Sequence, residues 1–173
     1  DIANEVKNIF PNDRIEFLSL DGKLQKIIIH KSPLLSYQVQ VLPEIVINRA
    51  EKEPELIQSF RSGLIESSFY LAGLKNDIPE SVIMDLAYIF AWDIDFVFDI
   101  RVGDKFRILY ETPFVDGQQI ENGSILFAEF YNQNNRFTAI RYKGKNKEWE
   151  YFNENGGSLE KAFLRAPLDF AYV

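Results

Sequence analysis

Two Asp-Gly pairs, each beside short strand-like runs, constrain the fold of this chain more than any other feature. Asp21-Gly22 lies between Arg14–Leu18 and Leu24–Ile29, and Asp116-Gly117 follows the run Lys105–Tyr110. A tight hairpin turn needs positive φ values, which Asp and Gly adopt readily, so such a pair marks a turn between strands. We therefore expect antiparallel hairpins on both sides of the middle of the chain.

Further strand-like runs occupy the same two regions. They are Tyr37–Val41, Ile45–Ile47, Ile125–Tyr131, Phe137–Tyr142 and Glu148–Phe152. Polar or Gly-containing connections separate the later runs, as is typical of a meander of strands.

The middle of the chain predicts a first helix by its apolar spacing. The residues that fall close to one helical face are Ile65, Phe69, Ala72 and Leu74. Gly73 followed by Leu74 suits a left-handed C-terminal cap with its apolar contact, so we expect this helix to end there.

A second helix is expected directly afterwards. Asp77 is the predicted N-cap, Pro79 falls in the first turn, and Glu80 can reach back to the cap. The apolar stripe of this helix is Ile78, Val82, Ile83, Leu86, Ile89 and Phe90. The predicted fold class is therefore α+β, with antiparallel strands and hairpins flanking two central helices.

Charge argues against nucleic acid as a partner. The 173 residues carry a net charge of -7, and the longest basic grouping is Lys143–Lys147. Phosphate backbones are bound through clustered Lys and Arg side chains, which an acidic chain of this kind lacks. We interpret Lys143–Lys147 as the solvent-exposed tip of a hairpin.

The chain also contains few residues that could bind a metal ion or act as a nucleophile. The chain has one histidine, His30, and no cysteine. Catalytic zinc takes several protein ligands, mostly His, Cys and carboxylates, and a Ser-His-Asp triad would lack the Gly-x-Ser-x-Gly elbow. We expect a structural or surface role for His30, and no catalytic, cofactor-binding or metal-binding residue in this chain.

Two other groups of side chains leave alternatives open. Asp93, Asp95 and Asp99 could include an acid–base pair for glycoside hydrolysis, although alternation with apolar residues favours capping and solvation. Aromatic side chains can also stack on sugars, although most of them pack in cores or on sheet faces. The aromatic candidates are Trp92, Trp149, Tyr151 and Phe152. The Gly-containing stretch Glu154–Ser158 lacks the Lys and the strand-to-helix context of a phosphate loop.

Four stretches carry a resemblance to a known family. They are Gly63–Tyr70, Ile89–Phe96, Asp99–Phe106 and Lys161–Leu168. In this order and spacing they resemble the region before the catalytic domain of lysostaphin-type (LytM-type) murein zinc endopeptidases of the MepM, ShyA and Csd3 kind. Near the start, Ile9–Ile15 resembles the closing turn and strand of a LysM-like module, with Asn12 where Gly is usual.

The resemblance implies a domain plan. Residues 1–22 would close a LysM-like module, 23–165 would form a central α+β domain, and 166–173 would begin the linker into a peptidase domain absent from this chain. The family's zinc ligands lie in that domain, in His-x-x-x-Asp and His-x-His motifs, so none is carried over to a position here.

The implied function is a non-catalytic regulatory or positioning region of a peptidoglycan-hydrolysing zinc endopeptidase. Its expected partners are the parent's own peptidase domain, whose cleft it would occlude, and peptidoglycan. The expected location is the periplasm or envelope of a Gram-negative bacterium, with a membrane anchor upstream in the parent.

Two other functions remain as alternatives. One is a stand-alone binding module for cell-wall glycan or a protein, and the other is an enzyme that uses carboxylates alone. The carboxylate enzyme would need a pocket that holds Asp93, Asp95 or Asp99.

Overall fold

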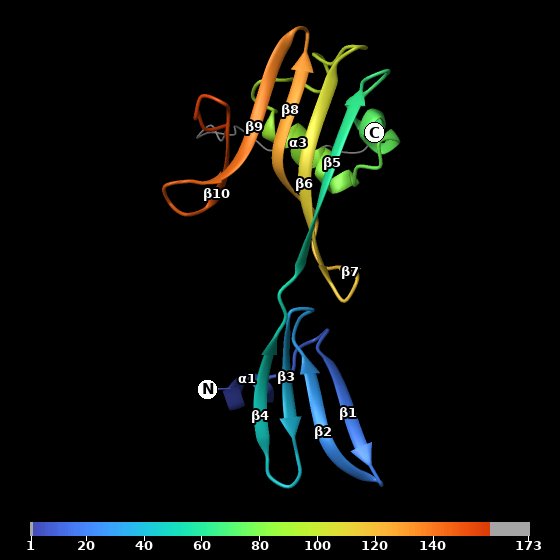
Figure 1. Cartoon of the computed structure of the whole chain (residues 1–173), viewed down its shortest axis with the longest axis vertical. Coiled ribbons are helices and arrows are strands. Elements are labelled where there is room, and N and C mark those ends of the chain that lie inside the picture. Colours follow the sequence, from blue (N-terminus) through green and yellow to red (C-terminus); the bar gives the residue numbers. More distant parts are fainter. Residues whose placement is uncertain (1, 160–173) are drawn as a thin grey trace. The chain divides into compact units, whose positions relative to one another are not determined.

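The computed structural model describes residues 2–159, which form two compact units (Figure 1). The first unit combines Asp1–Leu56 with Pro113–Glu121, and the second combines Ile57–Thr112 with Asn122–Val173. The predicted linker start at 166–173 lies outside the described residues. The assignment of residues 1–22 to a LysM-like module stays a prediction.

The first unit is built on a four-stranded antiparallel meander. It contains α1 (Ile2–Lys7), β1 (Arg14–Leu20), β2 (Lys23–His30), β3 (Leu35–Gln40) and β4 (Val46–Glu51), with the strands in the order β1-β2-β3-β4. Asp21 and Gly22 both have positive φ between β1 and β2, so the hairpin predicted there is confirmed.

The two faces of this first sheet differ in polarity. Ile29 and Tyr37 lie opposite each other on β2 and β3 and are buried, and the Tyr37 hydroxyl donates a hydrogen bond to Glu5 of α1. On the other face, Glu16, Ile28 and Gln38 form one cross-strand row. An antiparallel sheet with one packed and one largely polar face is the expected result of alternation.

The second unit is built on a longer sheet. Its elements are β5 (Glu55–Leu64), α2 (Phe69–Lys75), α3 (Glu80–Ile89), β6 (Lys105–Val115), β8 (Ser124–Asn132), β9 (Asn135–Lys143) and β10 (Trp149–Phe152), with the strands in the order β10-β9-β8-β6-β5. The first two residues of β5 and the last three of β6 belong to the first unit. The short β7 (Gln118–Gln119) pairs with the end of β6 through the turn at Asp116-Gly117, as that pair predicts.

Both helices of this unit pack on one face of the sheet (Figure 1). Phe69 of α2 lies at the centre of an aromatic cluster, with ring centroids 5.0 Å from Phe96, 5.4 Å from Phe106 and 5.6 Å from Phe130. The contacts with Phe106 and Phe130 are edge-to-face, and such contacts add to the free energy gained by burial. The core therefore sits between α2, α3 and one side of the sheet.

The predicted α+β class is wrong, because the described residues are mainly β. They form ten strands, whereas α2 and α3 have only 7 and 10 residues and cover one face of one sheet. The main cause of the error is Glu55–Leu64, to which no strand was assigned and which forms the ten-residue β5.

The predicted ends of the two helices are also wrong. Ser68 is the N-cap of α2, and its Oγ accepts a hydrogen bond from Leu71 N at 3.2 Å. Gly73 lies inside α2, and the left-handed residue after the helix is Asp77. Asp77 therefore does not cap α3, whose N-cap is Pro79 without a side-chain hydrogen bond.

Candidate docking surface

His30 ends β2 on the polar face of the first sheet, where it faces a carboxylate. Its Nε2 lies 3.2 Å from Glu16 Oε1, and Arg14 forms an ion pair with the same oxygen at 2.5 Å. Among residues 2–159 no group of three or more His, Cys, Asp and Glu side chains could hold a metal ion. The described donor set around His30 therefore does not fit a zinc site.

An open hollow of about 580 Å³ lies beside His30 in the first unit. The cations that line it have carboxylate partners: Arg14 pairs with Glu16, Lys31 with Asp13 and Lys52 with Asp116. Each of these cations is already neutralised by a carboxylate, so the hollow offers no unpaired positive charge to bind an anionic ligand. We therefore do not assign the functional site to it.

The acidic cluster after α3 holds its own loop together. Asp95 Oδ1 accepts hydrogen bonds from Val97 N at 2.9 Å and Phe98 N at 3.0 Å, and Asp99 Oδ2 accepts one from Asp95 N at 2.9 Å. Short side chains of this type form turns by bonding to nearby backbone amides. The geometry thus gives Asp95 and Asp99 a turn-forming role.

Asp104 is a second carboxylate with a structural position. It is only 6% exposed, and its Oδ2 accepts hydrogen bonds from Arg101 N at 2.7 Å and Asn132 Nδ2 at 2.8 Å. Its Oδ1 accepts a third hydrogen bond from Gln133 N at 3.2 Å. These hydrogen bonds connect the segment before β6 to the turn between β8 and β9. The stretch Asp99–Phe106 therefore has a structural role in this sheet.

The four aromatic candidates lie in different surroundings. Tyr151 packs against the core and donates a hydrogen bond to Ile125 O at 3.1 Å, and burial raises the pKa of its hydroxyl. Phe152 lies on the face opposite the helices, whereas Trp92 and Trp149 are exposed. The structure does not bring these four rings together.

The face of the second sheet opposite α2 and α3, which we call the open face, carries a row of apolar side chains. Leu109, Phe127, Ile140 and Phe152 lie directly opposite one another on β6, β8, β9 and β10. Phe106, Ile108 and Tyr110 belong to the core beneath the helices, so alternation turns Leu109 and the rest of the row the other way.

Neighbouring side chains widen this apolar row. An added Cβ on Gly63 would overlap the Phe106 ring, so Gly63 faces the core, and alternation along β5 places Phe60 and Leu64 on the open face. Both are exposed, as are Ile140 (42%) and Tyr142 (68%), which alternate on β9. The solvent side of an antiparallel sheet is normally polar, so this much apolar surface needs an explanation.

A row of ion pairs borders the apolar row. The side chain of Glu129 is 6% exposed and contacts Arg107 at 3.3 Å and Arg136 at 2.6 Å, and Arg136 also contacts Glu154 at 2.6 Å. The hydrogen bond with Glu129 raises the pKa of Arg136 above its ordinary value. The charges are held in fixed positions, which suits a surface that must dock in one orientation.

A face of this composition suits protein binding better than catalysis. It combines an apolar centre with an ordered polar border, which is the usual make-up of an interface between folded domains. The sequence carried one signal that could have revealed it. Ile108–Tyr110 and Ile125–Ala128 interrupt strict alternation with continuous apolar runs, which indicate strands that are apolar on both faces.

Comparison with known families identifies the second unit. Residues 53–172 match the model of the Csd3 second domain. The chain belongs to this family. The predicted resemblance to the region before the catalytic domain of LytM-type endopeptidases is confirmed.

Relatives of this Csd3-family chain are named as cell-wall enzymes. It is 35% identical over its whole length to peptidoglycan DD-endopeptidase ShyC of Vibrio cholerae, and it covers 40% of ShyC. It is 25% identical to peptidoglycan DD-endopeptidase ShyA of the same organism over 62% of the chain and 24% of ShyA. The chain thus spans well under half the length of these relatives.

Solved structures show the same fold. A zinc-containing peptidase from Vibrio cholerae matches 95% of this chain and 50% of its own, with a TM-score of 0.62 and 24% identity. Helicobacter pylori Csd3 in its orthorhombic crystal matches 80% of this chain and 38% of its own, with a TM-score of 0.59 and 15% identity.

Proposed function

We propose that this chain is the regulatory and positioning region of a zinc endopeptidase that hydrolyses peptidoglycan in the periplasm of a Gram-negative bacterium. Three relatives named as peptidoglycan DD-endopeptidases, ShyC, ShyA and ShyB of Vibrio cholerae, support the reaction and the compartment. The zinc-containing peptidase that shares the fold supports zinc in the parent protein.

The zinc belongs to the peptidase domain in this proposal. The metal would lower the pKa of a bound water and so generate the attacking hydroxide. In this proposal the zinc ligands lie outside residues 2–159, where no group of three or more His, Cys, Asp and Glu side chains could hold a metal ion. Their part is to hold the peptidase domain and to control access to its cleft.

The open face carries this proposal. Ile140 is exposed and Leu109, Phe127 and Phe152 are half-buried in one apolar row, whose remaining surface would be favourable to bury against another domain. The fixed pairs of Glu129 with Arg107 and Arg136 give the contact an orientation. A peptidase domain seated on this face would exchange between an occluded and an open arrangement, and the apolar contact would favour the occluded one.

The test compares hydrolysis of purified peptidoglycan by the parent protein, by its isolated peptidase domain and by the parent with Ile140→Glu. A carboxylate in the apolar row weakens the contact, so the variant should hydrolyse faster than the parent and approach the isolated domain. A change of roughly ten-fold is typical of coupling between two sites.

A matched substitution controls for the added charge. Ile45→Glu changes an isoleucine of the first unit that is 74% exposed, and it should leave the rate at that of the parent. Equal rates for the parent, the Ile140 variant and the isolated peptidase domain would show that this region does not restrain the enzyme.

The predicted membrane anchor upstream of this chain stays a prediction. Among residues 2–159, no helix has the length and apolar character needed to cross a bilayer.

A further inference from the structure

The β9–β10 hairpin concentrates positive charge in an otherwise acidic chain. The net charge of the chain is -7, yet residues 141–150 hold four cationic side chains and only two carboxylates. The cations are Arg141, Lys143, Lys145 and Lys147, and the carboxylates are Glu148 and Glu150. This local reversal of charge has no part in the docking surface described above.

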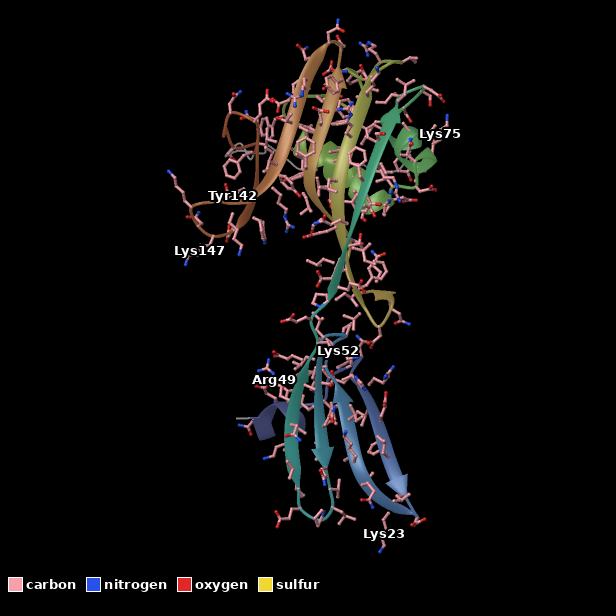
Figure 2. All side chains as sticks on the ribbon, viewed as in Figure 1. Lys23, Arg49, Lys52, Lys75, Tyr142 and Lys147 are labelled. Atoms are coloured by element: carbon pink, nitrogen blue, oxygen red, sulfur yellow. The ribbon has the colours of Figure 1, made fainter. Side chains whose placement is uncertain are left out.

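The tip of this hairpin is an ordered turn that projects its lysines into solvent. Gly144 N donates to Glu148 O at 2.8 Å, and Lys147 N donates to Gly144 O at 2.9 Å. Lys145 and Lys147 are exposed, and neither forms an ion pair within residues 2–159. Figure 2 shows Lys147 at the end of the hairpin, away from the sheet.

An exposed aromatic ring lies beside these cations. Trp149 is 54% exposed, with the Arg141 guanidinium carbon 4.5 Å and Lys143 Nζ 5.0 Å from its ring centroid. These cation–π contacts hold the indole in place. Tyr142, labelled in Figure 2, lies between Arg141 and Lys143 on β9, so alternation turns it to the open face, away from Trp149.

We propose that this hairpin binds peptidoglycan, through its lysines to stem-peptide carboxylates and through Trp149 to sugar rings. Peptidoglycan offers both chemistries at close spacing, because its amino sugars carry short peptides with free carboxylates. Lysine ammonium groups pair with carboxylates, and aromatic rings present flat apolar faces to sugars. The choice of polymer rests on the proposed function, which places the parent on peptidoglycan.

The test is co-sedimentation of the whole 173-residue chain with purified peptidoglycan. The triple variant Lys143→Gln, Lys145→Gln and Lys147→Gln should bind roughly ten-fold more weakly, since each exposed ion pair contributes modestly and the contributions add. Trp149→Ala should weaken binding as well, and added salt should weaken wild-type binding more than that of the triple variant.

A matched triple variant controls for charge alone. Lys7→Gln, Lys23→Gln and Lys26→Gln remove the same charge from the first unit and should bind like the wild type. Equal losses in both triple variants, or full binding to peptidoglycan whose carboxylates have been amidated, would overturn the proposal. Binding to vesicles of anionic phospholipid without binding to peptidoglycan would also overturn it, in favour of a membrane.

The two proposals fail separately. If peptidoglycan binding is unchanged in the lysine variant while Ile140→Glu still speeds hydrolysis by the parent, the hairpin proposal falls and the docking proposal stands. If the lysine variant loses peptidoglycan binding while Ile140→Glu leaves the rate of hydrolysis unchanged, the docking proposal falls and the hairpin proposal stands.

Discussion

Asp13 shows how single carboxylates organise the backbone of this chain. Its Oδ2 accepts a hydrogen bond from Phe10 N at 2.9 Å and forms an ion pair with Lys31 Nζ at 2.5 Å. Asn12, directly before it, has φ of 78°, a left-handed value that Asn adopts more easily than most residues. Asn12 can therefore occupy a position where the resemblance leads one to expect Gly.

The contacts of Asp13 make part of the first unit's stability depend on pH. The Lys31 hydrogen bond, helped by that from Phe10, lowers the pKa of Asp13 below its ordinary value of 3.8. The stabilisation is therefore present above 3.8 and is lost as the pH falls through the lowered pKa. We expect Asp13→Asn to lower the unfolding midpoint at neutral pH and to approach the wild type at acid pH, as measured by urea unfolding with far-UV circular dichroism.

Asp21→Asn is the control for this experiment. It removes one carboxylate from the exposed β1–β2 turn and keeps a residue that tolerates the φ of 50° found there. Its midpoint should follow that of the wild type across the pH range. A constant difference between Asp13→Asn and the wild type at all pH values would rule out the linkage.

Among the elements, α2 and α3 meet at a glycine. A Cβ added to Gly73 would lie 2.6 Å from Ile83 Cδ1 and 2.7 Å from Ile83 Cγ1. Glycine is therefore placed here to allow close approach of the two helices, although it lowers helix propensity.

The contact predicts an unfavourable Gly73→Ala substitution. Alanine would improve helix propensity by about 1 kcal/mol, whereas overpacking against Ile83 costs about 1–3 kcal/mol, so the net effect should be destabilising. Urea unfolding followed by tryptophan fluorescence measures the change. In an Ile83→Ala background, Gly73→Ala should cost less or become favourable, because the overlapping atoms are gone. Equal costs in both backgrounds would exclude the overlap as the cause.

The same glycine shows what could be predicted from sequence and what could not. Asp21-Gly22 and Asp116-Gly117 act locally through their φ values, and both predicted turns are present. Gly73 is required because it packs against Ile83, ten positions later in the sequence. Local sequence patterns do not show this contact, so Gly73 was wrongly predicted to end the helix. The open face escaped prediction for a similar reason, because Leu109 and Phe127 become neighbours only through strand pairing.

At the scale of the whole molecule, the chain contains two cores. Tyr37 is completely buried in the first unit, and the aromatic cluster of Phe69, Phe106 and Phe130 forms the core of the second. The family match over residues 53–172 covers the described part of the second unit. The buried residues of the first unit lie outside the core cluster of the second, so we expect each unit to have its own unfolding transition.

Both tryptophans, Trp92 and Trp149, belong to the second unit, so tryptophan fluorescence reports on that unit and far-UV circular dichroism on both. Tyr37→Ala removes a buried ring, which typically costs about 3–5 kcal/mol, and should shift part of the circular dichroism transition to lower urea. The fluorescence midpoint should stay at its wild-type value if the units unfold separately. Phe130→Ala should move the fluorescence midpoint and serves as the reverse control. A fluorescence midpoint that moves with Tyr37→Ala would mean that the two cores unfold as one, and the second unit would then need the first for its stability.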